Sequence, residues 1–335
     1  MPYIVCPLST FFLSLFHLLY QAVSFLLIIL LQKDYLGYTY IKYKKRDIVT
    51  REREGEVLML GLTVLESWFP ILSIVAMSYV GAMHTYMYSL IIAFFFYMAL
   101  MYKRDRFKEL KNKAAYKDLL LTTFWITFIF TLVFLGMQYT TAGNMAVIIF
   151  LQVLFSYLYF NVFGKEKMHT IHLIGAIIMG LGALIILFPA DFSFNKGDWL
   201  ILVSAAVAPI VNLYQKRART YCSAETILGF RTVVGFPFVA LMAYVLEPSV
   251  SYENFILALP YMFLIAIFIY VISKIMWIEA LNRISITKLS AMLALLPAMT
   301  LFFAYLYLDE IPEFRQIMGI IPVLLGGYLI TKPIE

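Results

Sequence analysis

The chain has 335 residues, of which 63% are hydrophobic and only 14% are charged. A soluble domain is about half apolar and about a quarter charged, so this composition excludes a soluble enzyme, a secreted disulfide scaffold and a disordered protein. The formal net charge of +6 does not indicate nucleic-acid binding, because the basic residues form short clusters between long apolar runs.

Apolar runs long enough to cross a bilayer follow one another along almost the whole chain. A membrane-spanning helix needs about 20 such residues. In chain order, the candidate segments are 3–32, 57–80, 82–102, 119–137, 142–163, 170–189, 198–215, 224–246, 255–279, 285–308 and 314–331. The sequence therefore predicts an all-α, multi-pass integral membrane protein with short connections between its helices.

The positions of lysine and arginine predict the orientation of these helices. Loops 33–56 and 103–118 are rich in basic residues, and smaller basic sets follow at 165–167, 216–219 and Arg283. Eleven helices place all of these loops on one side of the membrane. The positive-inside rule then puts the N-terminus outside and the C-terminus in the cytoplasm. No eukaryotic sorting signal is visible, which favours a bacterial cytoplasmic membrane.

The first apolar run stands apart from the other ten. It has no basic start and is too long for a cleaved signal peptide, so we expect an additional helix. The alternative is that residues 1–55 result from a wrongly chosen start. We predict three parts: residues 1–55 with the extra helix and a basic loop, and two five-helix repeats over 56–190 and 191–335.

The ten remaining helices contain an internal repeat with an offset of 144 residues. Without gaps, this offset pairs Glu166 with Glu310, Gly175 with Gly319, and Gly182 with Gly326. Because each repeat has an odd number of helices, the second must be inverted in the membrane. Inverted repeats around a midplane site are typical of secondary transporters.

These residues carry a resemblance to the EamA group of the drug/metabolite transporter superfamily. The similar features are the paired five-helix halves, the run from Ala280 to Pro297, and the glutamate-to-glycine patterns near the end of each half, around Glu166 and Glu310. The resemblance implies ten helices, cytoplasmic termini and a central cavity that moves metabolites. The extra helix departs from this pattern. The first repeat also lacks a counterpart of Pro297, and has Ser89 near the position equivalent to Arg231.

Three charged residues fall inside predicted helices, at depths of about 10–13 Å from the cytoplasmic face. They are Glu66, Arg231 and Lys274. A charge at the centre of a bilayer costs about 2.5–3.5 kcal/mol, so we expect these residues to surround one polar cavity. Glu66 would neutralise one cation and leave the other for an anionic substrate group. Arg231 could instead snorkel to the surface, and Glu66 could be a counter-ion or a proton-coupling carboxylate.

Several uncharged residues are further candidates for substrate contact. Trp68 and Trp277 could stack on a ligand or form cation–π contacts, although membrane tryptophans commonly serve as anchors or packing residues. Hydrogen bonds to substrate could come from Gln152, Tyr157 and Asn212, which could equally join helices. We predict that Gly175, Gly182, Gly319 and Gly326 are close-packing positions. We expect His84 and Glu279, near helix ends, to reach water.

The leading functional prediction is a secondary transporter that moves a small polar metabolite, such as an amino acid, by import or export. The alternative within the superfamily is an organic phosphate or nucleotide-sugar carrier, for which Lys288 would add a third cation. A lipid-modifying enzyme or a scaffold is favoured less, since no catalytic cluster or soluble segment is present. No cofactor, metal or nucleic acid is expected, the partners are the substrate and the bilayer, and proton coupling and oligomeric state stay open.

Overall fold

A computed structural model describes residues 45–162, 170–187, 195–284, 289, 292–293 and 295–331. The chain divides into two compact units, Met1–Asp47 and Ile48–Glu335. The second unit contains both predicted repeats. The predicted first helix over 3–32 lies outside the described residues.

The described part of the chain is all helical and contains no strand. It contains seven helices long and apolar enough to cross a membrane, together with three shorter apolar helices. This confirms the prediction of a multi-helix membrane fold. The helices are α2 (Lys45–Ser67), α3 (Phe69–Val80), α4 (Ala82–Lys103), η1 (Phe107–Lys111), η2 (Lys113–Ala115), α5 (Tyr116–Met137), α6 (Ala142–Phe150), α7 (Gln152–Tyr157), η3 (Leu158–Val162), α8 (Thr170–Leu187), α9 (Lys196–Ala218), α10 (Ala224–Leu246), α11 (Tyr252–Leu264), η4 (Ile265–Ser273), α12 (Lys274–Arg283), α14 (Leu295–Leu308) and α15 (Phe314–Thr331).

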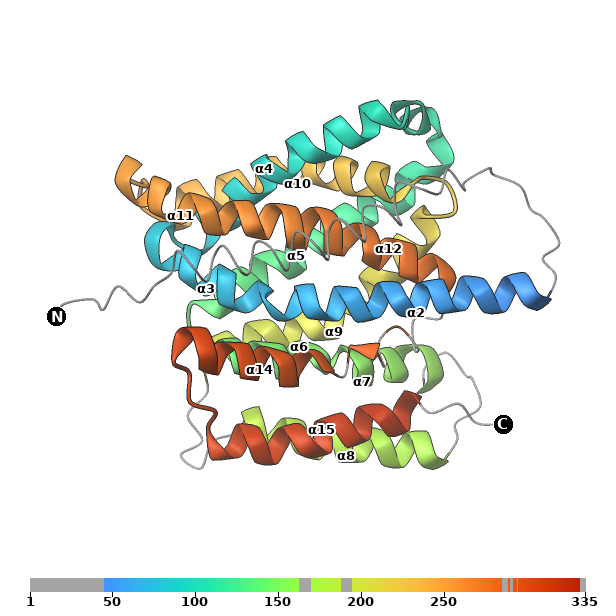
Figure 1. Cartoon of the computed structure of the whole chain (residues 1–335), viewed down its shortest axis with the longest axis vertical. Helices are drawn as coiled ribbons and strands as arrows, with labels where there is room; N and C mark the ends of the chain where they lie inside the picture. Colours follow the sequence, from blue (N-terminus) through green and yellow to red (C-terminus); the bar gives the residue numbers. More distant parts are fainter. Residues whose placement is uncertain are drawn as a thin grey trace. The chain divides into compact units, whose positions relative to one another are not determined.

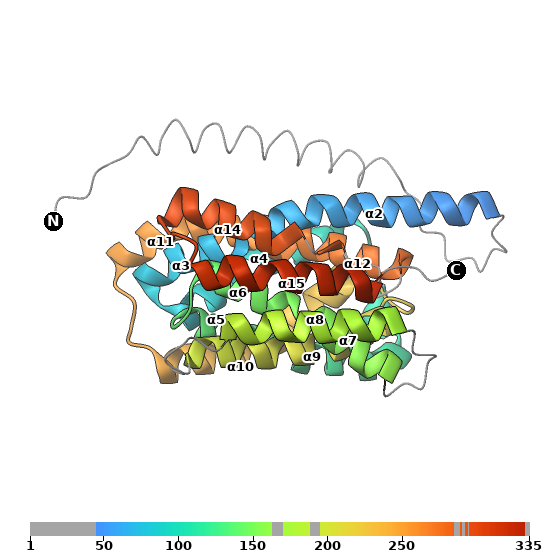
Figure 2. The ribbon, with the colours of Figure 1, turned by 90° about the horizontal axis from the view of Figure 1, so that it is seen from below.

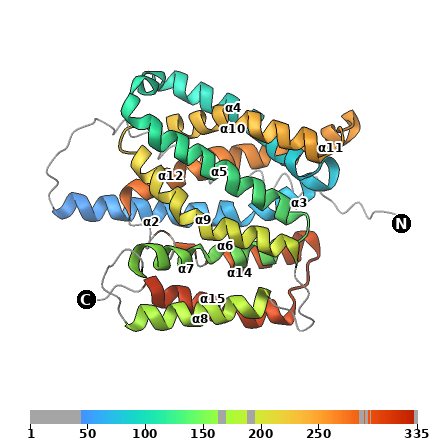
Figure 3. The same ribbon diagram turned by 180° about the vertical axis from the view of Figure 1, so that it is seen from behind.

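Equivalent helices of the two halves pack against each other. The last helices, α8 and α15, lie side by side at one edge of the bundle, and the second helices, α4 and α10, lie together at the opposite edge (Figures 1 and 2). The third helix of the first half, α5, packs along α9, the first helix of the second half (Figure 3). The symmetry-related contact, between the first helix of the first half and the third helix of the second half, joins α2 to α12 through Glu66 and Lys274. The arrangement has the two-fold pattern expected of an inverted repeat.

The two ends of the helix bundle carry different charges. One end, here called the basic end, includes Arg104, Arg219 and Arg283. At the opposite, acidic end lie Asp198 and Glu247. Glu54, in the N-terminal half of α2, pairs with Arg283 at the basic end. In contrast, α9 begins at the acidic end, where Asp198 lies in its first turn. The first helices of the two halves therefore run in opposite directions.

Regular helix is interrupted inside three of the predicted spans. Pro70 lies in the first turn of α3 and lacks the N–H that would bond to the Glu66 carbonyl, so the span over 57–80 breaks into α2 and α3. The span over 142–163 divides into α6, α7 and the π-helical η3. In the span over 255–279, nine residues of π-helix form η4.

Carboxylates from one half cap helices of the other half. Glu247, which follows α10, accepts hydrogen bonds from the backbone N–H groups of Met83 and His84, both at 2.9 Å, at the start of α4. A side chain on Gly81 would collide with this carboxylate, and Gly81 also has a φ of 87°. In the same way, Glu310 accepts from the N–H groups of Ala142 and Gly143 in the first turn of α6. These caps stabilise helix N-termini, where unpaired N–H groups carry partial positive charge.

Two residues expected to reach water are instead buried. His84 is 8% exposed, and its Nδ1 lies 2.8 Å from Glu247 Oε2. Glu279 is 7% exposed and bonds to Arg219 at 2.8 Å and to Arg283 at 2.5 Å. The expectation was wrong because it considered only distance from the helix end, whereas neighbouring helices cover both side chains.

The packing of α8 against α15 depends on glycines at matching positions. A Cβ on Gly182 would lie 2.8 Å from the carbonyl oxygen of Gly319, and a Cβ on Gly326 would lie 2.5 Å from that of Gly175. Both distances are too short for a side chain, so each helix approaches the backbone of the other where it carries glycine.

We predict that Gly182→Ala lowers the free energy of unfolding by about 1–3 kcal/mol, because the added methyl group overpacks this contact. Gly180→Ala, on the same helix, is the matched control because no other described residue places an atom within 4 Å of its Cβ position, apart from the backbone of its own helix. The control should gain about 0.5–1 kcal/mol from the lower chain entropy of alanine. Thermal unfolding of the purified variants in detergent measures both, and equal melting temperatures would contradict the packing role.

Candidate substrate-binding site

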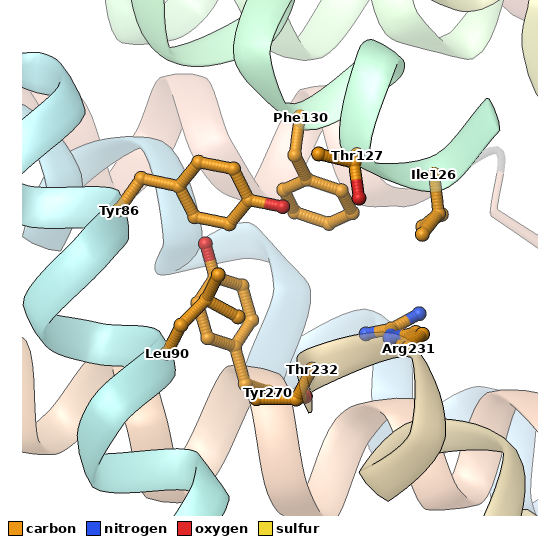
Figure 4. A pocket seen from close by; sticks show the side chains of 8 residues that line it. All are labelled: Tyr86, Leu90, Ile126, Thr127, Phe130, Arg231, Thr232 and Tyr270. Atoms are coloured by element: carbon orange, nitrogen blue, oxygen red, sulfur yellow. The ribbon is translucent and has the colours of Figure 1, made fainter. Parts of the chain in front are cut away.

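A small cavity lies between four helical segments in the middle of the bundle. Its walls come from α4, α5, α10 and η4, which belong to both halves (Figure 4). The lining residues are Tyr86, Leu90, Ile126, Thr127, Phe130, Arg231, Thr232 and Tyr270. The cavity has a volume of about 10 Å³, which is about enough for one water molecule. An organic solute needs a wider cavity, so this conformation is closed around the site.

Arg231 is the charged group of this cavity. Its side chain is 7% exposed, and within the described part of the chain no carboxylate forms an ion pair with it. Figure 4 shows its guanidinium on the opposite side of the cavity from the aromatic rings of Tyr86 and Tyr270. A buried cation without a counter-ion is unfavourable, and an anionic ligand would relieve that cost.

Aromatic residues provide most of the remaining wall. The rings of Tyr86 and Phe130 stack at 5.8 Å, and Tyr270 meets Phe130 edge-on at 5.6 Å. The Tyr270 hydroxyl is buried and has no hydrogen-bond partner among the residues that the structure describes. A buried hydroxyl without a partner costs about 1–3 kcal/mol, so a ligand or water that bonds to it is favoured.

The π-helical segment η4 holds Tyr270 in this position. The Tyr97 hydroxyl of α4 donates a hydrogen bond to the backbone carbonyl of Tyr270. This contact joins helices of the two halves directly beside the cavity. Single π-helical turns are frequent at functional sites, because the extra residue per turn changes the direction of the side chains that follow.

Glu66 and Lys274 form a second charged site next to the cavity. Lys274 Nζ lies 2.6 Å from Glu66 Oε1, and the side chains are 15% and 13% exposed. Glu66 also accepts a hydrogen bond from the Ser273 hydroxyl. Phe130 connects the two sites, because Lys274 Nζ lies 5.5 Å from the centre of its ring. The pair holds the broken end of α2 against α12 of the other half.

The three predicted charged residues are thus arranged as a pair and a single cation. Glu66 and Lys274 are bonded to each other, and neither is among the residues that line the cavity. Arg231 lines the cavity without a carboxylate partner among the described residues. The positive charge beside the cavity that lacks a counter-ion is therefore that of Arg231.

The uncharged candidates lie away from the cavity lining. Trp68 stacks on Phe303 at 4.6 Å and contacts Tyr307, as a packing residue would. Trp277 is partly buried on α12. Gln152, Tyr157 and Asn212 are buried on α7 and α9. Within the described ranges, the Tyr157 hydroxyl and Asn212 Nδ2 have no hydrogen-bond partner.

Sequence reasoning missed the lining residues Tyr86, Thr127, Phe130 and Tyr270. Aromatic residues make up 17% of the chain, so no single tyrosine or phenylalanine is distinctive in the sequence. Their role depends on which face of each helix points inward. No group of three or more potential metal ligands is found among the residues that the structure describes.

We predict that Lys274→Met and Glu66→Gln each destabilise the protein by about 3–5 kcal/mol, because each leaves a buried polar partner uncompensated. The double variant should lose less than the sum of the two, because it removes both charges together. Thermal unfolding of the four proteins in detergent measures this coupling. Strictly additive losses would show that the two side chains do not interact.

The two halves each match a known family model. Residues 53–188 and 195–332 both match the EamA-like transporter family. An uncharacterized transporter of Archaeoglobus fulgidus is 26% identical over 215 residues, which cover 62% of this chain and 72% of the relative. A chloroplastic WAT1-related protein of Arabidopsis thaliana is 28% identical over 218 residues, 59% of this chain and 50% of the relative.

A solved structure has the same fold. It aligns with a TM-score of 0.62 over 82% of this chain and 96% of its own, at 14% sequence identity. The duplicated family match, the relatives named as transporters and the apolar helices show that this is an integral, multi-pass membrane transporter of the drug/metabolite transporter superfamily. The chain belongs to the EamA-like transporter family.

Proposed function

We propose that this protein is a secondary transporter for a small polar metabolite that carries an anionic group, with Arg231 as its anchor. The observation that supports this most directly is a buried guanidinium that lines a central cavity and has no carboxylate partner among the described residues. The Tyr270 hydroxyl, which lacks a hydrogen-bond partner in the described part of the chain, would provide a polar contact, and Tyr86 and Phe130 would provide an aromatic wall.

We propose a carboxylate as the anionic group in preference to a phosphate. Lys274 is already neutralised by Glu66, so among the described residues a single positive charge faces the cavity; Lys288 lies outside the described residues. A carboxylate carries one negative charge and two oxygens that match the donors of a guanidinium. A phosphate ester carries close to two charges at neutral pH and would favour a second free cation.

Transport would proceed by alternating access of the two halves, residues 56–190 and 191–335, around this cavity. The Glu66–Lys274 pair joins the halves beside the cavity. A substrate bound to Arg231 would lie near the pair, so occupancy could alter its strength. Glu66 is our candidate for proton coupling, because protonation would release Lys274 from it. The predicted orientation places the basic end in the cytoplasm.

The experiment is uptake into proteoliposomes of radiolabelled monocarboxylates, amino acids, organic phosphates and uncharged polyols. We expect at least one carboxylate to cross above protein-free controls. Arg231→Gln should weaken its apparent affinity by roughly 10- to 100-fold, since a charged hydrogen bond contributes about 1.5–3 kcal/mol.

Arg217→Gln is the matched control, because Arg217 is an exposed cation that stacks over Tyr214 at the basic end. It removes the same charge and should leave uptake unchanged. Faster uptake of phosphates than carboxylates would favour the second substrate class. If no polar solute crosses, or Arg231→Gln carries the solute as well as the parent, the proposal is wrong.

A further inference from the structure

Tyr97 of α4 is almost completely buried beside the central cavity. Its side chain is 1% exposed and is not among the residues that line the cavity. The lining residues Tyr86 and Leu90 lie on the same helix, and Tyr97 follows Leu90 by seven residues, which is about two turns along the same face. On the adjoining helix α10, a Cβ on Gly229 would lie 3.7 Å from Tyr97 Cβ. Tyr97 therefore packs against the part of α10 that carries Arg231.

The Tyr97 hydroxyl interacts with both a backbone carbonyl and a buried cation. It donates its proton to the carbonyl of Tyr270 in η4. It also lies close enough to the Arg231 guanidinium to interact with it electrostatically. A phenol has one proton to donate and lone pairs that accept. Because the proton goes to the Tyr270 carbonyl, the oxygen offers its lone pairs to the N–H groups of Arg231.

These groups form a polar chain that runs from α10 through α4 to η4. Polar groups in such a chain polarise one another, and the effect is larger in a protein interior than in water. The positive charge of Arg231 thus makes the Tyr97 hydroxyl a stronger donor to the Tyr270 carbonyl. An anion bound to Arg231 would offset that charge and weaken this hydrogen bond.

The carbonyl that Tyr97 holds belongs to the segment that leads into the Glu66–Lys274 ion pair. Ser273, the last residue of η4, donates a hydrogen bond to Glu66, and the next residue, Lys274, lies 2.6 Å from Glu66 Oε1. A π-helix of nine residues is unusual, since most are single turns. The third helix of the first half, α5, is α-helical over its whole length. The hydrogen bond from Tyr97 therefore supports the irregular segment that places both partners of Glu66.

We propose that Tyr97 is a positioning residue that links the Arg231 site to the Glu66–Lys274 pair. It holds the guanidinium at the cavity and, through the Tyr270 carbonyl, holds η4 in the form that keeps the pair together. An anion on Arg231 weakens this hold, so occupation of the cavity weakens the pair. Because such coupling is reciprocal, loss of the pair strengthens anion binding. The part that concerns anions rests on the function proposed above.

The first test needs no ligand. Arg231→Gln removes the positive charge, as a bound anion would offset it, and Glu66→Gln breaks the ion pair. The melting temperatures of the single and double variants in detergent measure the coupling between them. The double variant should lose at least about 2 °C less than the sum of the two single losses. In a Tyr97→Phe background, the same two losses should add.

Tyr88→Phe is the matched control background, because it removes a hydroxyl from the same helix. Tyr88 is partly buried, and its ring meets Phe255 edge-on. The coupling should persist in this control. Additive losses in the parent, or a coupling that is unchanged by Tyr97→Phe, would overturn the proposal. If Tyr97→Phe does not fold, Ser273→Ala interrupts the same connection at its other end and should also reduce the coupling, whereas an undiminished coupling would contradict it.

The second test measures equilibrium binding of radiolabelled benzoate, a carboxylate on an aromatic ring, to the purified protein. Tyr97→Phe should weaken binding about 3- to 10-fold, because the guanidinium loses a hydrogen-bonding partner that orients it. Glu66→Gln should strengthen binding about fivefold in the parent and leave it unchanged in Tyr97→Phe. A merely structural role of Tyr97 would leave the effect of Glu66→Gln the same in both backgrounds, which would overturn the link.

The two proposals fail separately. Coupled melting temperatures without benzoate binding would support the link through Tyr97 and count against the proposed anion site. Benzoate binding that depends on Arg231, together with additive melting losses in the parent, would support the anion site and overturn the link.

Discussion

An ionised side chain inside an apolar helix bundle needs a counter-ion, hydrogen bonds or water, and this constraint organises the centre of the protein. Lys274 meets it through Glu66, and the pair joins the first half of the chain to the second. For Arg231, no carboxylate among the described residues forms an ion pair. One cation is therefore structural, and the other faces the cavity without a carboxylate partner in the described part of the chain.

Breaks in regular helix put these groups where they are. Pro70 ends the hydrogen-bond ladder of α2 at Glu66, so the carboxylate lies at the point where the helix is interrupted. On the opposite side, η4 brings Tyr270 to the cavity and Ser273 to Glu66. Irregular backbone at membrane depth is tolerated where it is enclosed by protein, as it is here. The break in the first half thus positions a carboxylate, whereas the irregular segment in the second half positions a tyrosine and a serine, although the halves share a fold.

Duplication explains both the symmetry of the scaffold and the asymmetry of the site. Packing positions are repeated: Gly182 and Gly326 occupy matching positions in the last helices. Charged positions are not repeated, because Arg231 corresponds approximately to Ser89. Packing must be satisfied twice for the halves to fit together, whereas one anion needs only one cation.

The sequence by itself determined the helical membrane fold, its two inverted halves and the three unusual charges. Run length, basic loops and the 144-residue offset are properties of the chain read in one dimension, and a charge in an apolar run is costly in any fold. Only the tertiary structure decided that Glu66 pairs with Lys274, that Trp68 packs on Phe303, and that Tyr270 faces the cavity. These contacts depend on the rotation of each helix about its axis and on the packing of residues far apart in the chain. An apolar run without a polar face determines neither.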